Sequence, residues 1–157
     1  LFLLISGCGY LPASKQARKV VGERLFVEVT VPLQDPENAV VIKDAMQKAV
    51  VTRFHSALVS KKQAKTSLMV EMTSIAFAPL QYNENGYIIV YRAGIVIAVT
   101  REIKGKKTVY TSKGNYDFTI EPNAVITDTQ RFEAISKASL KALDSFVAQV
   151  GAEGTRL

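Results

Sequence analysis

Residues 87–104 read YIIVYRAGIVIAVTREIK and form the longest strand-like stretch of the chain. Successive side chains of a β-strand point to opposite faces of a sheet, so this stretch presents two rows of residues. One row suits packing beneath helices and consists of Tyr87, Ile89, Tyr91, Ala93, Ile95, Ile97 and Val99. The other row consists of Ile88, Val90, Arg92, Gly94, Val96, Ala98 and Thr100. This second row is too apolar for an ordinary solvent-facing row, which indicates contact with a partner; the alternative is a central strand that leaves aliphatic side chains in water.

Two further strand-like runs flank this stretch, at residues 66–80 and 108–121. Turn signals at residues 83–86 (NENG) and 105–106 (GK) join the three runs into a meander. These strands are longer than the helices that cover them, because a strand rises about 3.3 Å per residue and a helix about 1.5 Å. We therefore expect the hairpin ends to project beyond the core, with bulges near Ser74, Ile75 and Pro79.

The segments outside the meander complete an α+β domain. Apolar residues alternate over residues 25–31, which predicts a first strand. The sequence Asp-Pro-Glu at residues 35–37 predicts the start of a helix that ends near Ser60. Thr127 stands three positions before a Gln, in capping-box spacing, and predicts a second helix that ends at Gly151. The order strand, helix, three strands, helix predicts two helices packed on one face of a four-stranded mixed or antiparallel sheet.

The first residues are typical of the end of a signal peptide. The apolar run at residues 1–5, followed by Ser6 and Gly7, leads into Cys8 and fits the bacterial lipobox, in which a small residue precedes a Cys that receives a lipid. A buried strand with a structural Cys is the alternative. An Asp after the Cys is the usual inner-membrane retention signal, and Gly9 stands there instead, so we expect anchoring in the outer membrane. The predicted organisation is a signal-peptide remnant at 1–7, a lipidated N-terminus and tether at 8–23, a domain at 24–151 and a tail at 152–157.

The composition indicates one folded domain without metal or redox chemistry. The chain has 157 residues, of which 48% are hydrophobic and 22% charged, as in a globular protein. One His and one Cys exclude a His- or Cys-rich metal cluster and a disulfide within the chain. A lone His55 on the polar side of a helix is typical of an inert residue, and the carboxylates Glu71 and Asp117, if they face each other, make only a weak case for a hydrolase. We therefore expect a non-enzymatic protein that uses no cofactor and no metal.

Positive charge gathers at one end of the predicted sheet. The chain has 20 Lys and Arg residues against 14 Asp and Glu residues. An up-and-down topology places the loop after the first helix and the last hairpin turn at the same end of the sheet. The lysine pole, as we call this group, consists of Lys61, Lys62, Lys65, Lys104, Lys106 and Lys107. It can attract phosphate groups or an acidic protein surface, the alternative being a solvated lysine-rich loop; no aromatic and basic motif favours nucleic acid.

The sequence SGCGY at residues 6–10, the order of strands and helices, and the stretch 86–100 with Tyr91 and Arg92 inside it resemble the lipopolysaccharide-assembly lipoprotein family LptE. The resemblance covers residues 5–150. It implies a lipid-anchored protein on the periplasmic face of the outer membrane that plugs an LptD-type β-barrel and binds lipopolysaccharide without catalysis. An accessory lipoprotein of another envelope lipid-transport system is the alternative, and a periplasmic hydrolase is less favoured.

The resemblance also implies where the contacts lie. Lipopolysaccharide contacts in the family are associated with basic residues at the tip of the hairpin between the second and third strands and before the last helix. Residues 82–86 and 121–125 occupy these places and contain no Lys or Arg. We therefore expect the lysine pole, together with Arg92, to bind the phosphates of the lipid. The residues expected to contact the barrel are Tyr82, Asn85, Ile88, Val90 and Val96.

Overall fold

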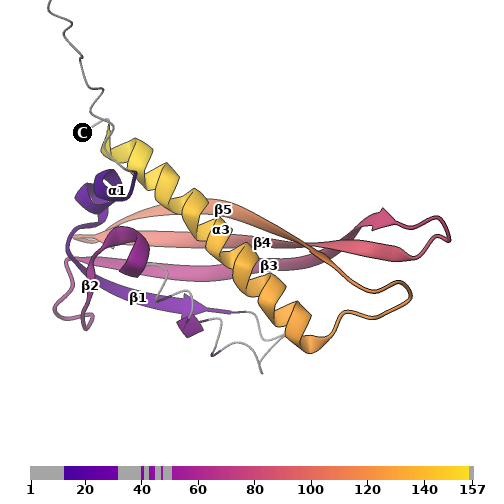
Figure 1. The fold of residues 1–157 in the computed structure, drawn as a ribbon. Helices are drawn as coiled ribbons and strands as arrows, with labels where there is room; N and C mark the ends of the chain where they lie inside the picture. Colours follow the sequence, from indigo (N-terminus) through magenta and orange to yellow (C-terminus); the bar gives the residue numbers. More distant parts are fainter. Residues whose placement is uncertain (1–12, 32–39, 41–42, 45–46, 48–50, 156–157) are drawn as a thin grey trace, which may run out of the picture.

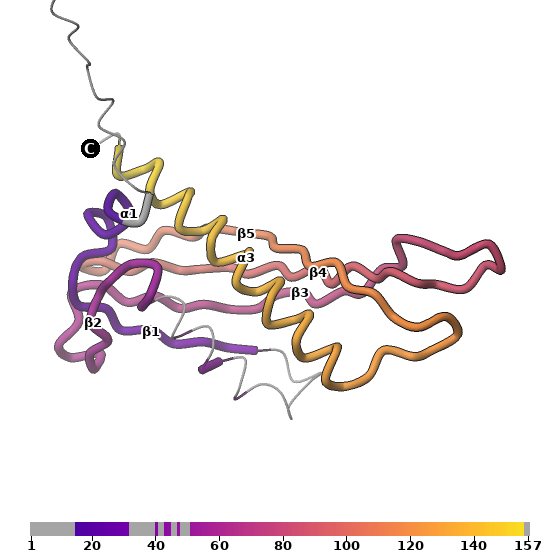
Figure 2. Tube along the Cα trace, viewed as in Figure 1, coloured from indigo at the N-terminus to yellow at the C-terminus, as the bar shows by residue number. Residues whose placement is uncertain are grey.

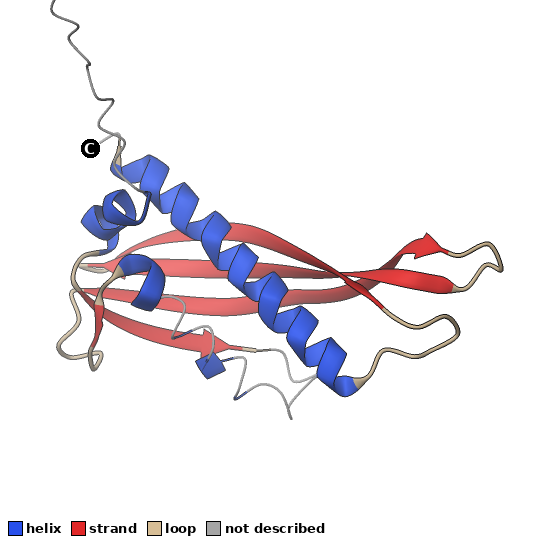
Figure 3. Ribbon diagram, viewed as in Figure 1, coloured by secondary structure: helices blue, strands red, loops and turns tan. Residues whose placement is uncertain are grey.

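A computed structural model describes residues 13–31, 40, 43–44, 47 and 51–155 of the chain. In this described part, one mixed sheet has the strand order β2-β1-β3-β4-β5. Its strands are β1 (Arg24–Thr30), β2 (Ala57–Leu58), β3 (Thr66–Tyr82), β4 (Ile88–Ile103) and β5 (Lys106–Thr119). Helix α1 (Ala13–Val21) precedes them in the chain, and helix α3 (Asp128–Gly154) follows them and crosses one face of the sheet diagonally (Figures 1 and 3). The predicted α+β class with helices on one face is confirmed.

The predicted count of four strands is wrong, because β2 adds a fifth. This two-residue strand pairs in parallel with the start of β1 and is too short to produce a periodic signal. The helix predicted to end near Ser60 ends at Phe54 instead, since His55 adopts a left-handed conformation with φ of 50°. Ser56 then donates a hydrogen bond of 2.8 Å to the carbonyl of Gly22, which holds this turn against the end of α1. The predicted start of that helix at residues 35–37 lies outside the described residues.

The antiparallel meander of β3, β4 and β5 forms as predicted. Ala93, Ile95, Ile97 and Val99 are at most 1% exposed beneath the helices, so the inward row assigned to this part of β4 is confirmed. The register of β3 against β4 shifts between Met72 and Ser74 and again between Pro79 and Tyr82. The shift at Ser74 and the shift after Pro79 lie where bulges were predicted, and the second has a clear cause, since Pro79 lacks the N–H that a regular ladder needs. A third shift, between Gln81 and Tyr82, was not predicted.

The β3–β4 hairpin runs on past the N-terminal end of α3, as the strand lengths predicted (Figure 2). Its loop is organised by Asn83, whose Oδ1 accepts hydrogen bonds from the backbone N–H groups of Asn85 at 3.0 Å and Tyr87 at 2.9 Å. At the other end of the sheet, Lys104 and Gly105 both have positive φ and form the tight turn between β4 and β5. This two-residue turn fixes which residues of β4 and β5 face each other.

Helix α3 begins with the predicted capping box, in which Thr127 and Gln130 each satisfy a backbone N–H of the other. Its close approach to β5 depends on Gly114, since a Cβ there would lie 2.0 Å from the carbonyl oxygen of Ala138. The predicted stop at Gly151 is wrong. Gly151 does not adopt the positive φ of a terminating glycine, is buried, and the helix continues to Gly154.

Residues 13–21 were expected to belong to a structureless tether, and this expectation is wrong. They form α1, whose Ala17, Val20 and Val21 are buried in the same core cluster as α3 residues. The two helices touch at Gly154, where an added Cβ would lie 2.5 Å from the carbonyl oxygen of Gln16. A nine-residue helix is marginal by itself, so packing rather than local propensity stabilises it.

A partly buried ion pair fastens the C-terminal end of α3 to the sheet. Arg101 donates to Glu153 at 2.8 and 3.3 Å, and the Tyr110 hydroxyl donates to the same carboxylate. The hydrogen bonds from Arg101 and then Tyr110 lower the pKa of Glu153, whereas burial, followed by the bond to Glu153, raises the pKa of Tyr110 to about 12. Arg101, Tyr110 and Glu153 therefore hold α3 against the sheet.

Candidate functional site

The face of the sheet opposite α1 and α3 carries the second row of β4, and no described helix covers it (Figure 1). Register places Thr100 between Met69 of β3 and Val109 of β5, which are 44% and 64% exposed. The open face, as we call it, has apolar members on three strands, namely Met69, Ala76, Ala78, Val90, Gly94, Val96, Ala98 and Val109. The register places polar residues among them, namely Glu71, Ser74, Arg92, Thr100, Thr111, Lys113, Asn115 and Asp117. Its small and aliphatic side chains lie mainly along β4, with polar side chains beside them on β3 and β5, and this mixed surface suits contact with another surface better than enclosure of a small ligand.

Met69 and Val109 were missed as members of this face. The turn that pairs Val109 with Thr100 is formed by Lys104 and Gly105, one residue before the turn predicted at residues 105–106. Met69 depends on the register of β3 against β4, which the bulge at residues 72–74 shifts. A bulge moves every later side chain by one position, so alternation alone does not assign the face.

The predicted barrel-contact residues lie on the projecting hairpin and on the open face. Tyr82 is 57% exposed and pairs with half-buried Ile88 near the end of the hairpin. Asn85 is exposed in the turn that Asn83 organises. Val90 and Val96 are half-buried farther along β4. Hairpin and face together form one continuous strip along the same strand.

The lysine pole gathers at the opposite end of the sheet from this hairpin. Thr66 pairs with Ile103, which brings the loop before β3 next to the turn between β4 and β5. Lys61 lies over the ring of Phe26, 6.0 Å from its centroid, and Lys107 lies 3.9 Å from a Glu102 oxygen. Lys62 and Lys106 are exposed.

A groove of about 730 Å³ opens between α1 and this end of the sheet. Lys19 of α1 lines it together with Lys65 and Lys104 of the pole. The lysine groove, as we call it, is also lined by Val20, Val21, Gly22, Ala64, Thr66 and Ile103. The contribution of Lys19 was missed because residues 13–21 gave too short a pattern to predict a packed helix.

The structure does not bring Arg92 to the lysine pole. Arg92 and Lys104 stand twelve positions apart along β4 and its turn, which is about 40 Å at roughly 3.3 Å per residue. Arg92 instead forms a bidentate pair with Asp117, with N···O distances of 2.7 and 2.8 Å. The hydrogen bond from Arg92 lowers the pKa of Asp117, and that bond raises the pKa of Arg92. The expectation that Arg92 acts together with the lysines is therefore wrong on geometry.

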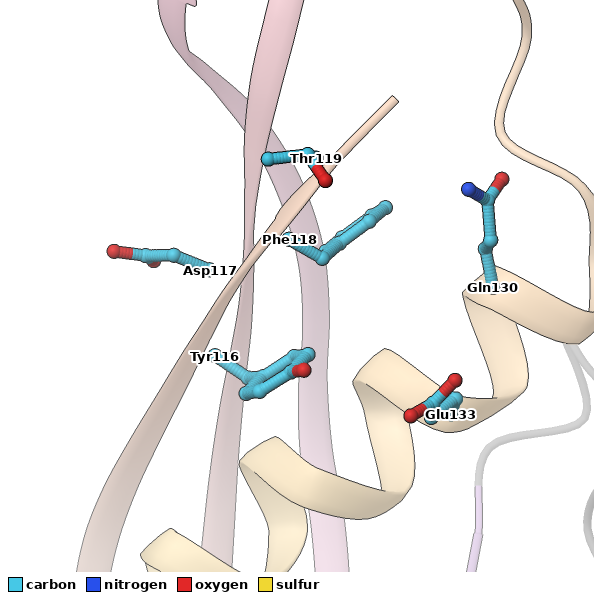
Figure 4. Close-up of a pocket in the computed structure, with 6 residues that line it drawn as sticks. All are labelled: Tyr116, Asp117, Phe118, Thr119, Gln130 and Glu133. Atoms are coloured by element: carbon cyan, nitrogen blue, oxygen red, sulfur yellow. The ribbon is translucent and has the colours of Figure 1, made fainter. Parts of the chain in front are cut away.

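A second hollow, of about 310 Å³, lies between β5 and the N-terminal half of α3. Figure 4 shows Tyr116 and Phe118 pointing toward α3, whereas Asp117 points away from it. On the helix side, Glu133 pairs with Lys137 at 2.6 Å, and Lys137 also donates to the Tyr116 hydroxyl at 3.0 Å. These two bonds raise the pKa of Lys137. The hollow's charged groups thus satisfy one another.

The described residues form no catalytic arrangement. Glu71 and Asp117 do not face each other, as the weak case for a hydrolase required, because they stand beside Ala98 and Arg92, about 20 Å apart along β4. His55 is exposed in its turn. Within the described chain, His, Cys, Asp and Glu side chains nowhere gather in a group of three that could hold a metal ion.

The family model for LptE, a lipopolysaccharide-assembly family, matches residues 26–150, which is most of the chain and all of β1 to β5 except two residues. The chain belongs to the LptE family. Its role is therefore that of a lipoprotein in lipopolysaccharide assembly in the cell envelope, and the family is not one of enzymes. No curated protein matches the sequence.

Solved structures share the fold of this LptE-family chain. Rare lipoprotein B from Shewanella oneidensis has a TM-score of 0.55 at 12% identity, covering 85% of this chain and 97% of that one. An uncharacterized lipoprotein B from Nitrosomonas europaea has a TM-score of 0.50 at 11% identity, covering 85% and 84%. Likeness at this level of identity shows the fold alone. Within the described residues, no helix combines the length and apolar character needed to cross a bilayer.

Proposed function

We propose that this LptE-family chain is anchored to the outer membrane through a lipid on Cys8 and plugs an LptD-type β-barrel. The observation that carries the proposal is the open face of the sheet, continuous with the projecting hairpin, in a chain of this family. The inner wall of a barrel is a curved sheet, and a twisted sheet face of small and aliphatic residues is a shape that can lie against it.

A charge on the open face tests this contact. Val96 is half-buried at the centre of the face, so Val96→Asp places a carboxylate where the proposed interface excludes water. Ala148 is exposed on α3, on the other side of the sheet, so Ala148→Asp adds the same charge outside the proposed interface as a matched control. We expect the Val96 variant to lose copurification with a large β-barrel, and the control to keep it.

The same copurification experiment distinguishes the plug from an accessory role in another envelope lipid-transport system. Recovery of inner-membrane transporter subunits instead of a barrel contradicts the plug and favours an accessory role in another lipid-transport system. Mass spectrometry of the mature protein tests the anchor, since an unmodified Cys8 contradicts lipid attachment.

The proposal includes non-catalytic binding of lipopolysaccharide through the lysine pole. Lysine ammonium groups can pair with the phosphates of lipid A, and such pairing weakens as salt rises. Replacing Lys61, Lys62, Lys104 and Lys106 by Ser is expected to weaken binding in a salt-dependent way. Unchanged affinity at low salt contradicts this part of the proposal.

A further inference from the structure

We infer that the lysine groove binds the headgroup of an anionic phospholipid in the membrane that carries the protein's anchor. The inference rests on one element of the proposed function, the lipid at Cys8. It depends neither on the barrel nor on lipopolysaccharide, and it assigns Lys19 of α1 to a binding site.

The charge of the groove suits a phosphate diester. Lys19, Lys65 and Lys104 come from three separate elements and line one groove. No Asp or Glu is among the residues that line it, and none of the three lysines forms an ion pair within the described residues. Three unpaired ammonium groups around one space leave a positive potential that an anion can neutralise.

The apolar part of the groove indicates a lipid rather than a soluble anion. Val20, Val21, Ala64 and Ile103 contribute to its lining. Its volume of about 730 Å³ falls in the range of sites for small organic molecules and far exceeds what a phosphate ion fills. Lysine stems also present methylene groups beneath their charged ends. A phospholipid headgroup with the glycerol region beside it offers charge and apolar surface in the same arrangement.

The position of the groove relative to the anchor selects the membrane as the source. Cys8 and the start of α1 at Ala13 are five positions apart, which is about 17 Å even when fully extended. Lys19 follows about 9 Å along the helix. The groove therefore lies within about 26 Å of the anchored residue, while the β3–β4 hairpin projects from the opposite end of the sheet (Figure 1). The anchor keeps a bilayer surface near the groove at all times.

The test measures vesicle binding by the full chain with Cys8→Ser, so that no acyl anchor contributes. Vesicles of phosphatidylcholine with added phosphatidylglycerol are compared with vesicles of phosphatidylcholine alone and with lipopolysaccharide aggregates. Among the vesicles, binding is expected only where phosphatidylglycerol is present. Lipopolysaccharide aggregates are expected to bind as well, through the lysine pole, and Lys19→Ser is expected to leave that binding unchanged. Lys19→Ser is expected to weaken vesicle binding about fivefold, which corresponds to about 1 kcal/mol for one basic residue near an anionic surface. Lys19→Arg is expected to retain vesicle binding.

Lys113→Ser is the matched control, because it removes one exposed lysine from β5 without touching the groove. It should leave vesicle binding unchanged, and circular dichroism should show that both variants fold. Failure to bind phosphatidylglycerol vesicles, or equal losses for Lys19→Ser and Lys113→Ser, overturns the inference. If Lys19→Ser weakens binding to lipopolysaccharide but not to vesicles, the groove belongs to the lipopolysaccharide site and the inference is also wrong. Failure to copurify a barrel contradicts the proposed function alone.

Discussion

Gly114→Ala places a methyl group against the backbone of α3. The new Cβ would lie 2.0 Å from the carbonyl oxygen of Ala138 and 2.3 Å from the amide nitrogen of Ala142. Real Cβ atoms keep about 3.0 Å from such atoms, so the helix must withdraw from β5 by about 1 Å or more. Backbone atoms cannot rotate away as a side chain can. The collision therefore moves the whole helix.

The magnitude follows from what the helix covers. Ile135, Leu143 and Phe146 are at most 1% exposed between α3 and the sheet, and withdrawal loosens all of their contacts. Overpacking of a core costs about 1–3 kcal/mol, and this case belongs at the upper end or beyond because no side chain can yield. A loss of about 3 kcal/mol lowers the Tm of a domain of this size by about 10 °C.

Urea and thermal unfolding followed by circular dichroism measure the effect. Gly94→Ala is the matched control, since Gly94 lies on β4 but on the open face, where the new Cβ meets the Asn115 side-chain oxygen at 3.3 Å and the Ala76 carbonyl oxygen at 3.9 Å. We expect this control to stay within about 0.5 kcal/mol of the wild type. If Gly114→Ala is as stable as Gly94→Ala, the close packing of α3 on β5 is not as described.

Three further predictions concern the helices. Gly154→Ala would bring a Cβ within 2.5 Å of the Gln16 carbonyl, so amide exchange in α1 is expected to accelerate while β4 stays protected; uniform protection would contradict the contact. Thr127→Ala removes the N-cap of α3 and is expected to lower the free energy of unfolding by about 1 kcal/mol in urea, and no change would contradict the capping box. The pKa of Glu153 is lowered in the folded protein, so the stabilisation from its carboxylate is present above the ordinary pKa of 4.5 and is lost as the pH falls through the folded-state pKa. In Glu153→Gln the free energy of unfolding should therefore vary less with pH over this acid range. Parallel pH profiles of the variant and the wild type would refute this prediction.

The aromatic hollow between β5 and α3 shows how charged residues near a cavity can be fully occupied with one another. Lys137 binds both Glu133 and Tyr116, and it also lies over the Tyr116 ring at 4.7 Å from the centroid. In the lysine groove the comparable lysines have no such partners among the described residues. A lysine without an acidic partner can attract an external anion, whereas a lysine already paired with a neighbouring carboxylate or hydroxyl cannot do so as readily.

Several features of the site were predictable because they depend on neighbouring residues. Alternation along residues 87–104 assigned the buried row of β4 from Ala93 to Val99, since strand geometry alone decides which side chains share a face. The turn predicted at residues 105–106, which the structure forms one residue earlier at Lys104 and Gly105, placed the two groups of the lysine pole at one end of the sheet. The order of strands, turns and helix N-caps along the chain predicted the α+β class.

Features that depend on contacts between distant residues were not predictable in this way. Helix α1 is stable because Ala17, Val20 and Val21 pack in the core with α3. The nine residues of α1 contain no local pattern that predicts this contact. Arg92 was assigned to the lysines by charge, but strand register pairs it with Asp117 instead.

The amino-acid sequence by itself therefore determined the strand faces, the turns and the class of fold, because these follow from backbone geometry over a few residues. Only the tertiary structure decided that α1 adds Lys19 to the groove, that β2 extends the sheet, and that the open face includes Met69 beyond a bulge. Each of these depends on packing or register between segments far apart in the chain. Such contacts form only when the whole chain folds, so no local stretch of sequence encodes them.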